Sequence, residues 1–238
     1  MRVKFGHRTR LSATGKVTLG NWSPMNDASA LAFIDFTNAH SVTLETGISQ
    51  VLNLVDLSNN MLQTLASHQP AYVNGEAVFT GDGSGVAQDL YFATQITGVK
   101  TLFIISAESP AGSPKWGTLM SAKAGETQYW HRGYISDTNK PVLSTVYPTG
   151  WNHVKNGTQW INNTVANFVA TLWSTTTSLM TLRVEAGYSA SYNHMGLDRA
   201  WTARAFNGTA RGLYLSSRYY TDTEIDVINK ELMRYFNV

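Results

Sequence analysis

The sequence predicts an all-β protein, a sandwich or barrel of antiparallel strands that ends in one helix. Short apolar and aromatic runs recur along the 238 residues, and several alternate apolar with polar residues, as half-buried strands do. Charged residues make up only 14% of the chain and aromatic residues 11%, a composition that suits strands with turn-rich connections better than a helical bundle.

The expected strands are runs bounded by turn residues. They cover residues 30–36, 49–55, 77–81, 89–94, 100–107, 116–122, 127–135, 167–173, 181–188 and 209–217. In "VKNGTQWI", Asn156 and Gly157 lie between strand formers, and this dipeptide predicts a β-hairpin. Many short strands without intervening helices favour a two-layer sandwich or a barrel.

The end of the chain departs from this pattern. Thr221 is followed three residues later by Glu224, which predicts a capping box at the start of a helix. Apolar residues then recur at helical spacing on one face, at Ile225, Ile228, Leu232 and Phe236. The acidic residues near the start of this segment suit the helix dipole. We therefore expect a short helix that lies against a sheet.

Basic residues gather at the beginning of the chain. The net charge is only +2, too small to imply a nucleic-acid or membrane partner for the whole domain. The residues that precede the first acid, Asp27, include Arg2, Lys4, Arg8, Arg10 and Lys16. We interpret residues 1–24 as a basic arm for docking or assembly, with nucleic-acid binding as the alternative, and residues 25–238 as one domain.

Several classes of protein do not fit the sequence. There is no cysteine, so a disulfide framework and a cysteine-based zinc site are excluded. The first residues lack the apolar run of a secretory signal, and no stretch approaches the ~20 apolar residues of a membrane span. We expect a chain that is made in the cytoplasm and is not exported by a cleaved signal.

Aromatic residues between positions 116 and 160 are the candidate ligand site. Sugar rings have apolar C–H faces that stack on aromatic rings, while amide and backbone groups bind the hydroxyls. The candidate glycan-binding residues are Trp130, Tyr134, Trp151, Trp116, Trp160 and His131. The alternative is that these rings fill the core of the sandwich.

Carboxylates and histidines give little support to catalysis or metal binding. Glycoside hydrolysis needs two carboxylates that face one sugar, but Asp35, Glu108, Glu185 and Asp198 are each isolated in the sequence. The segment "GDGSG" (81–85) is expected to be a turn, and its single acid, Asp82, is too few for a calcium site. The histidines lack the spacing of zinc ligands, so we expect no metal and no cofactor.

The order of these segments resembles the concanavalin A-like lectin/glucanase superfamily. The segments "NWSPMNDASALAFIDF", "QPAYVNGEAVFTGDGSG", "KTLFIISAESPAGSPKWGTLMSA" and "VKNGTQWI" follow the order of its laminin-G-like jelly-roll domains. The closest match is "MGLDRAWTARAFNGTARGLYLSSRYYTDTEIDVINKEL", although Gly212 lies near a position where many members carry an acid and Tyr220 where many carry Leu. The resemblance implies a two-sheet antiparallel jelly roll with a short C-terminal helix.

Such domains are common in bacteriophage tail fibres and other virion proteins. The resemblance implies a non-enzymatic virion protein, made in the host cytoplasm, that binds host-surface glycan or attaches to neighbouring virion subunits. One alternative is a purely structural decoration or connector subunit, and another is a glycan-cleaving hydrolase. The glucanases of the superfamily carry E-x-D-x-x-E on one strand, which this sequence lacks. We expect a homo-oligomer, which would form through the domain surface or the arm because there are no coiled-coil heptads.

Overall fold

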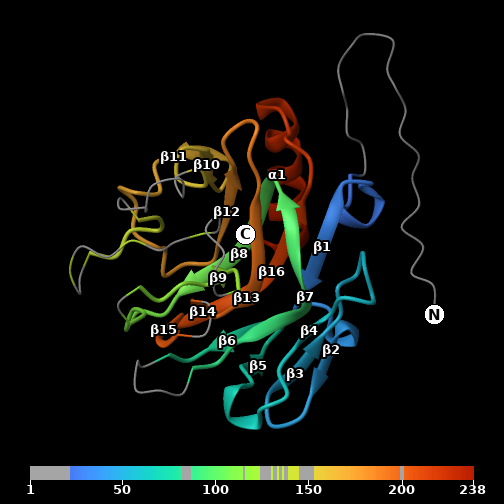
Figure 1. Ribbon diagram of the computed structural model, residues 1–238, viewed down its shortest axis with the longest axis vertical. Coiled ribbons are helices and arrows are strands. Elements are labelled where there is room, and N and C mark those ends of the chain that lie inside the picture. The colour runs from blue at the N-terminus through green and yellow to red at the C-terminus, as the bar shows by residue number, and fades with distance from the viewer. Residues whose placement is uncertain are drawn as a thin grey trace.

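Two antiparallel β-sheets pack over a shared core, and one helix covers the outer face of the larger sheet (Figure 1). This arrangement comes from a computed structural model, which describes residues 22–81, 87–114, 116–123, 130, 133, 136, 139–144, 153–198 and 201–238, with only the backbone at 201 and 202. The two sheets are called sheet A and sheet B below.

Sheet A is the larger sheet and has eight strands. Its order is β11 (Thr164–Ala166), β10 (Thr158–Ile161), β12 (Ser178–Arg183), β8 (Thr101–Glu108), β16 (Gly208–Ser216), β6 (Glu76–Phe79) and β5 (Ala71–Val73). The remaining strand, β1 (Ala30–Asp35), also pairs with β16. Strands β12, β8, β16 and β1 therefore lie side by side although they come from distant parts of the sequence.

Sheet B has six strands, and a separate two-stranded ribbon follows its last long strand. Its order is β2 (Val42–Leu44), β3 (Ile48–Val51), β4 (Met61–Leu62), β7 (Leu90–Val99), β13 (Ala190–Met195) and β9 (Met120–Ser121). The ribbon consists of β14 (Leu197–Asp198) and β15 (Trp201–Ala205). Single 3₁₀ turns occur at η1 (Pro24–Asn26), η2 (Ala39–Ser41) and η3 (Ala66–His68).

Strand β8 shows how the sequence builds three layers. All of its residues are buried, because both faces of the strand are covered. Leu102 and Ile104 point into the main core between the sheets, while Phe103 and Ile105 belong to the cluster beneath the helix. Successive side chains of a strand point to opposite faces, so a continuous apolar run fits a strand between two layers. Each such side chain stabilises the fold by about 1.5–3 kcal/mol.

Helix α1 (Asp222–Phe236) confirms the helix expected from the sequence. Thr221 and Glu224 form both hydrogen bonds of the capping box. The apolar face is buried as expected at Ile225, Ile228, Leu232 and Phe236. The helix ends at Asn237, whose left-handed backbone (φ 54°) places its N–H on the carbonyl of Met233. In the described part of the chain no helix has both the length and the apolar character that crossing a membrane requires.

The structure confirms an all-β protein with antiparallel sheets and one C-terminal helix. The expected strands at 30–36, 77–81, 89–94, 100–107 and 209–217 correspond to β1, β6, β7, β8 and β16. The run 167–173 forms no strand; instead Phe168 and Trp173 fill the core from a turn. Most of the run 127–135 and Asp82 of "GDGSG" lie outside the described residues, although Gly81 and Ala87 form an antiparallel bridge.

The hairpin expected at Asn156 and Gly157 is wrong. The described residues directly before them, 153–155, form a turn, and strand β10 begins only at Thr158. Glycine is needed at 157 for space, because a Cβ there would lie 2.0 Å from the carbonyl oxygen of Arg183. The hairpin of this region has its turn at Asn162 and Asn163 instead, where φ is 45° and 66°, as a two-residue turn between β10 and β11 requires.

Candidate functional site

Trp130 belongs to the core. Its ring is fully buried, and its Nε1 donates a 2.8 Å hydrogen bond to the carbonyl oxygen of Val142. The ring centroid lies 5.5 Å from that of Phe168 and 5.6 Å from that of Trp173. A sugar cannot stack on a ring that has no exposed face. The expectation that Trp130 binds glycan is therefore wrong, and its role is to pack the core.

Trp160 and Trp116 do not form an exposed aromatic surface either. Trp160 is buried in the cluster beneath the helix, so it too is corrected to a packing residue. The guanidinium carbon of Arg183 lies 5.2 Å from its ring centroid. Trp116 is half-buried and has a left-handed backbone (φ 62°). Some of the predicted residues lie outside the described part of the chain, namely His131, Tyr134 and Trp151 and the arm residues Arg2, Lys4, Arg8 and Arg10.

The isolated acids of the sequence have structural partners. Tyr235 donates to Asp35, the backbone N–H of Ser113 donates to Glu108, and Arg204 donates to Asp198. These hydrogen bonds hold neighbouring segments of the fold together. They also offset the free-energy cost of burying a carboxylate away from water. Among the described residues there is no group of three or more metal-ligating side chains.

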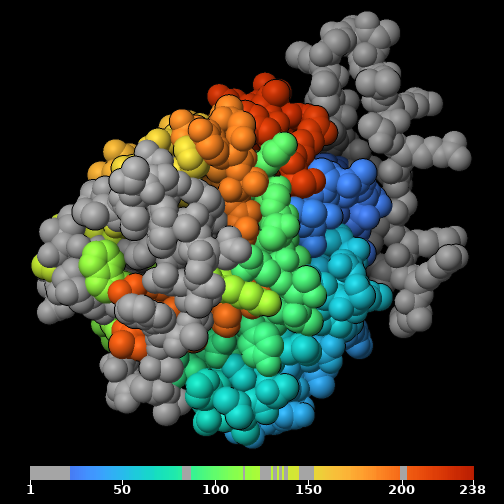
Figure 2. Space-filling view, in the orientation of Figure 1, coloured from blue at the N-terminus to red at the C-terminus, as the bar shows by residue number. Residues whose placement is uncertain are grey.

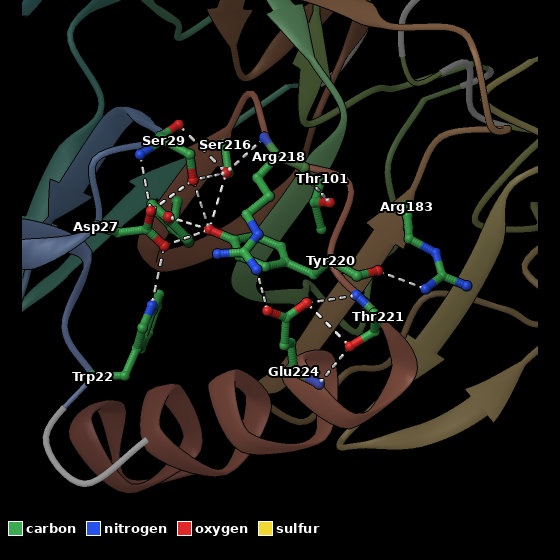
Figure 3. A network of polar contacts seen from close by, with 11 residues as sticks. Trp22, Asp27, Ser29, Thr101, Arg183, Ser216, Arg218, Tyr220, Thr221 and Glu224 are labelled. Atoms are coloured by element: carbon green, nitrogen blue, oxygen red, sulfur yellow. Dashed lines mark hydrogen bonds and ion pairs between the residues drawn. The ribbon is translucent and has the colours of Figure 1, made fainter. Parts of the chain in front are cut away.

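A polar network joins the beginning of the described chain to the start of helix α1; we call it the junction (Figure 3). The Asp27 carboxylate accepts hydrogen bonds from Nε1 of Trp22 (3.1 Å), from Oγ of Ser29 (2.6 Å) and from the hydroxyl of Tyr220 (2.5 Å). The Tyr220 hydroxyl is also 2.8 Å from that of Tyr214. The first described residues therefore lie next to helix α1 (Figure 2).

Hydrogen bonding sets the charge state of the junction. Burial alone would raise the pKa of Asp27, but hydrogen bonds, chiefly from Ser29 and Tyr220, hold it below its ordinary value. Burial raises the pKa of Tyr214 and Tyr220, and for Tyr220 the bond to Asp27 adds to this effect. At neutral pH Asp27 is therefore ionised, while Tyr214 and Tyr220 are neutral hydroxyl groups. The hydrogen bond from Tyr220 to Asp27 then holds the helix start to the segment before β1.

The junction continues to the helix N-terminus through Arg183. Nη1 of Arg183 donates to the carbonyl oxygen of Tyr220 and pairs with Oδ1 of Asp222, both at 2.7 Å. Arg218 forms an ion pair with Glu224 of the capping box. The helix start is thus fixed by the end of β12, by the chain before β1 and by its own cap.

A second polar site, which we call the Tyr188 platform, lies at the turn after β12. The ring of Tyr188 stacks on the ring of His153, with centroids 3.3 Å apart and planes 9° apart. Oε2 of Glu185 is 2.7 Å from Nδ1 of His153 and 3.4 Å from Nδ2 of Asn156. Tyr188 remains 47% exposed, so a flat ring, a carboxylate and an amide are presented together at the surface.

Backbone hydrogen bonds hold the platform in place. The N–H of Glu185 donates to the carbonyl of His153 (3.0 Å), and the N–H of Tyr188 donates to the carbonyl of Glu185 (3.1 Å). The hydrogen bond with His153 holds the pKa of Glu185 below its ordinary value, so Glu185 is ionised at neutral pH. An oriented ring beside an ionised carboxylate can stack on the C–H face of a sugar while the carboxylate accepts its hydroxyls.

Sequence reasoning missed this platform. The run 181–188 was expected to be one strand, which would have made Tyr188 an ordinary strand residue, but β12 ends at Arg183. The available signal was Gly187, which interrupts the run directly before Tyr188 and marks a turn. The contact with His153 joins residues from separate loops and has no local signal.

No protein-family model matches the chain, and no curated protein is significantly similar to it in sequence. The function is therefore inferred from the geometry of the platform and the junction, together with the resemblance in pattern described above.

Proposed function

We propose that this chain is a non-enzymatic surface protein of a bacteriophage virion, such as a tail-fibre or tail-tip component, that binds host-surface glycan. The observation that carries the proposal is the Tyr188 platform, an exposed ring stacked on His153 with Glu185 beside it. The protein would be made in the host cytoplasm and would act as part of the virion.

The proposed fold is a concanavalin A-like jelly roll of the laminin-G-like type. It is supported by the antiparallel strands, by the two sheets that share a core and by the C-terminal helix. The resemblance in the order of sequence segments supports the same assignment. A jelly roll is compatible with many functions, so the ligand must be argued from the platform itself.

In the proposed complex, one sugar ring stacks on the face of Tyr188 that points away from His153. Glu185 accepts hydrogen bonds from sugar hydroxyls, and the amide of Asn156 donates to one. Because His153 already holds the Tyr188 ring, little side-chain entropy is lost when the sugar binds.

Glycan-array binding and adsorption to host cells test the platform. Tyr188→Ala should abolish or strongly reduce both, whereas Tyr188→Trp, which keeps a stacking ring, should retain them. Leu57→Ala is the control, because Leu57 is a similarly exposed apolar side chain on another loop (65% against 47%). Unchanged binding and adsorption by a folded Tyr188→Ala variant would contradict the proposal.

The second candidate is a purely structural decoration or connector subunit, and the junction favours it. A docking arm needs a firm attachment to its domain, and the chain before β1 is held to the helix start by Asp27 and Tyr220. This candidate predicts that removal of residues 1–20 abolishes incorporation into the virion, whereas Tyr188→Ala has no effect on assembly or adsorption. A homo-oligomer would then form through the arm or the domain surface, and light scattering would detect its mass.

A glycan-cleaving hydrolase is the weakest candidate. The described acids Asp35, Glu108 and Asp198 have structural partners, and Glu185 is held by His153. Release of reducing ends from host polysaccharide by the purified protein would contradict the non-enzymatic proposal.

A further inference from the structure

A hollow of about 360 Å³ lies on the outer face of sheet A. Its floor is one row of residues across adjacent strands: Thr209 of β16 is opposite both Val78 of β6 and Ala107 of β8. Thr177, directly before β12, extends this row, because the next residue, Ser178, is opposite Ser106. The row belongs to the face that carries helix α1, since Ala107 shares the parity of Phe103 and Ile105 along β8.

Small side chains create this hollow. Beneath the helix, the same face of β8 carries Phe103 and Ile105, which fill the space under α1. Beyond the helix the face carries Ala107 and Thr209, whose short side chains leave a depression in place of a packed layer. The volume is within the range of pockets that bind small ligands.

The walls of the hollow are polar. Threonine hydroxyls from Thr175, Thr177 and Thr209 border it, and within the described part of the chain they have no hydrogen-bond partner. Asn207 stands at one end, with its amide nitrogen fixed by a 2.9 Å hydrogen bond to the carbonyl of Gly112. The hollow therefore offers several donors and acceptors whose positions are set by strands and short loops.

One carboxylate is held in place at the opposite side. Oε1 of Glu76 accepts a 2.5 Å hydrogen bond from Nε of Arg211, and Nη1 of Arg211 donates to the carbonyl of Phe236 at the end of the helix. Arg211 thereby fixes the Glu76 side chain, while the second carboxylate oxygen can accept from a ligand.

We propose that this hollow binds one neutral sugar ring, at a site separate from the Tyr188 platform. Several hydroxyls, an amide and one oriented carboxylate match the many hydroxyls of a sugar, and the threonine methyl groups and Val78 match its C–H groups. An anionic ligand is disfavoured by Glu76 and Glu108, and a flat apolar ligand is disfavoured by the unpartnered hydroxyls.

The hollow and the Tyr188 platform lie at opposite ends of strand β8, so a ligand in one does not touch the other. The platform follows Arg183, which is opposite Thr101 on β8, whereas the hollow lies at Ala107 on the same strand. The distance from Thr101 to Ala107 along a strand is roughly 20 Å. Tyr188→Ala is therefore expected to leave binding in the hollow unchanged.

Methyl NMR of the full chain with labelled threonines tests the proposal. Titration with glucose, galactose, mannose and N-acetylglucosamine should shift the methyl signals of Thr175, Thr177 and Thr209 for at least one sugar, in the Tyr188→Ala variant as well. Thr209→Val keeps the shape and the β-branched side chain but removes one hydroxyl, so it should weaken binding roughly threefold to tenfold. Thr43→Val, at an exposed threonine of β2, is the matched control and should change nothing.

The proposal fails if none of the four sugars shifts these signals, or if Thr209→Val binds as tightly as the unchanged protein. Its failure is distinguishable from that of the proposed function, because glycan-array binding that depends on Tyr188 would then persist. Sugar shifts in the hollow without any effect of Tyr188→Ala on host adsorption would support the hollow and reject the platform.

Discussion

The hydroxyl of Tyr220 donates a 2.5 Å hydrogen bond to the carboxylate of Asp27, a residue 193 positions earlier in the chain. The same hydroxyl lies 3.0 Å from Oγ of Ser29 and 3.0 Å from Oγ of Ser216. The Tyr220 hydroxyl thus joins the segment before β1 to the end of β16, directly before the helix.

Tyr220→Phe should lower the free energy of unfolding by about 1–3 kcal/mol, because a half-buried carboxylate loses a charged hydrogen bond. Urea unfolding measures the loss. Tyr188→Phe, which removes the hydroxyl of an exposed tyrosine, is the control and should be nearly neutral. Equal stability of the two variants would show that the junction does not hold the domain together.

Asp89 predicts a pH dependence of stability. Its carboxylate is buried beside Gln63, whose Nε2 donates a 2.6 Å hydrogen bond, and 3.8 Å from Nδ1 of His68. Burial raises the pKa of Asp89 to about 6, although His68 and Gln63 oppose the shift. The folded state therefore binds this proton more tightly than the unfolded state does. The stabilisation is fully present below the ordinary pKa near 4 and is lost as the pH rises through 6.

Asp89→Asn isolates this contribution. Between pH about 7 and pH about 4 the unchanged protein should gain roughly 2–3 kcal/mol from Asp89, and the variant should lack this gain. Denaturant midpoints at several pH values measure the difference. The lowered pKa of Asp27 acts in the opposite direction only at the acidic end, where that carboxylate becomes protonated. Parallel pH profiles of the two proteins would contradict the prediction.

The turn between β5 and β6 predicts a cost for a side chain at Gly75. Asn74 and Gly75 have φ of 52° and 79° between the paired residues Val73 and Glu76. Gly75→Ala should cost about 1–2 kcal/mol, because an L-residue is strained in the left-handed region. Asn74→Gly is the control and should cost no more than about 0.5 kcal/mol, since glycine adopts this conformation readily. Thermal unfolding compares them, and an unchanged Gly75→Ala protein would show that the turn relaxes.

The cluster beneath helix α1 predicts that the helix contributes strongly to stability. Leu232 is almost fully buried there. Leu232→Ala should lower the free energy of unfolding by about 2–5 kcal/mol. Lys230→Ala, on the exposed side of the same helix, should lose only the ion pair with Asp226, or about 0.5 kcal/mol. If the two losses were equal, the helix would be only loosely attached to sheet A.

The elements with a strong pattern in the local sequence were predicted correctly. The capping box predicted where α1 begins, the apolar spacing predicted its buried face, and the run 100–107 predicted β8. The hairpin failed because the Asn156–Gly157 dipeptide has two explanations, a turn or close packing, and only the contact with Arg183 distinguishes them. The Asn162–Asn163 turn carries a weaker signal, yet tertiary pairing selects it.

The candidate site was harder to predict for a similar reason. Aromatic content alone does not tell which rings face solvent, and Trp130 and Trp160 proved to be core residues. Tyr188 is one of several exposed rings and becomes notable only through its contact with His153 from another loop. Burial and contacts between loops are properties of the folded chain.

The register of sheet A determines how the domain would respond to a pulling force. Arg183 is opposite Thr101, Thr101 is opposite Ser216, and Ser216 is opposite Ala30, so one row of residues runs from the platform side to the junction. If the virion holds the arm and the host holds the Tyr188 platform, tension between the two particles crosses this row at right angles to the strands. Strands pulled in this direction separate one hydrogen-bonded pair at a time. Tyr220 joins the two ends of the row, because its carbonyl accepts from Arg183 and its hydroxyl donates to Asp27, whose backbone carbonyl accepts from Ala30.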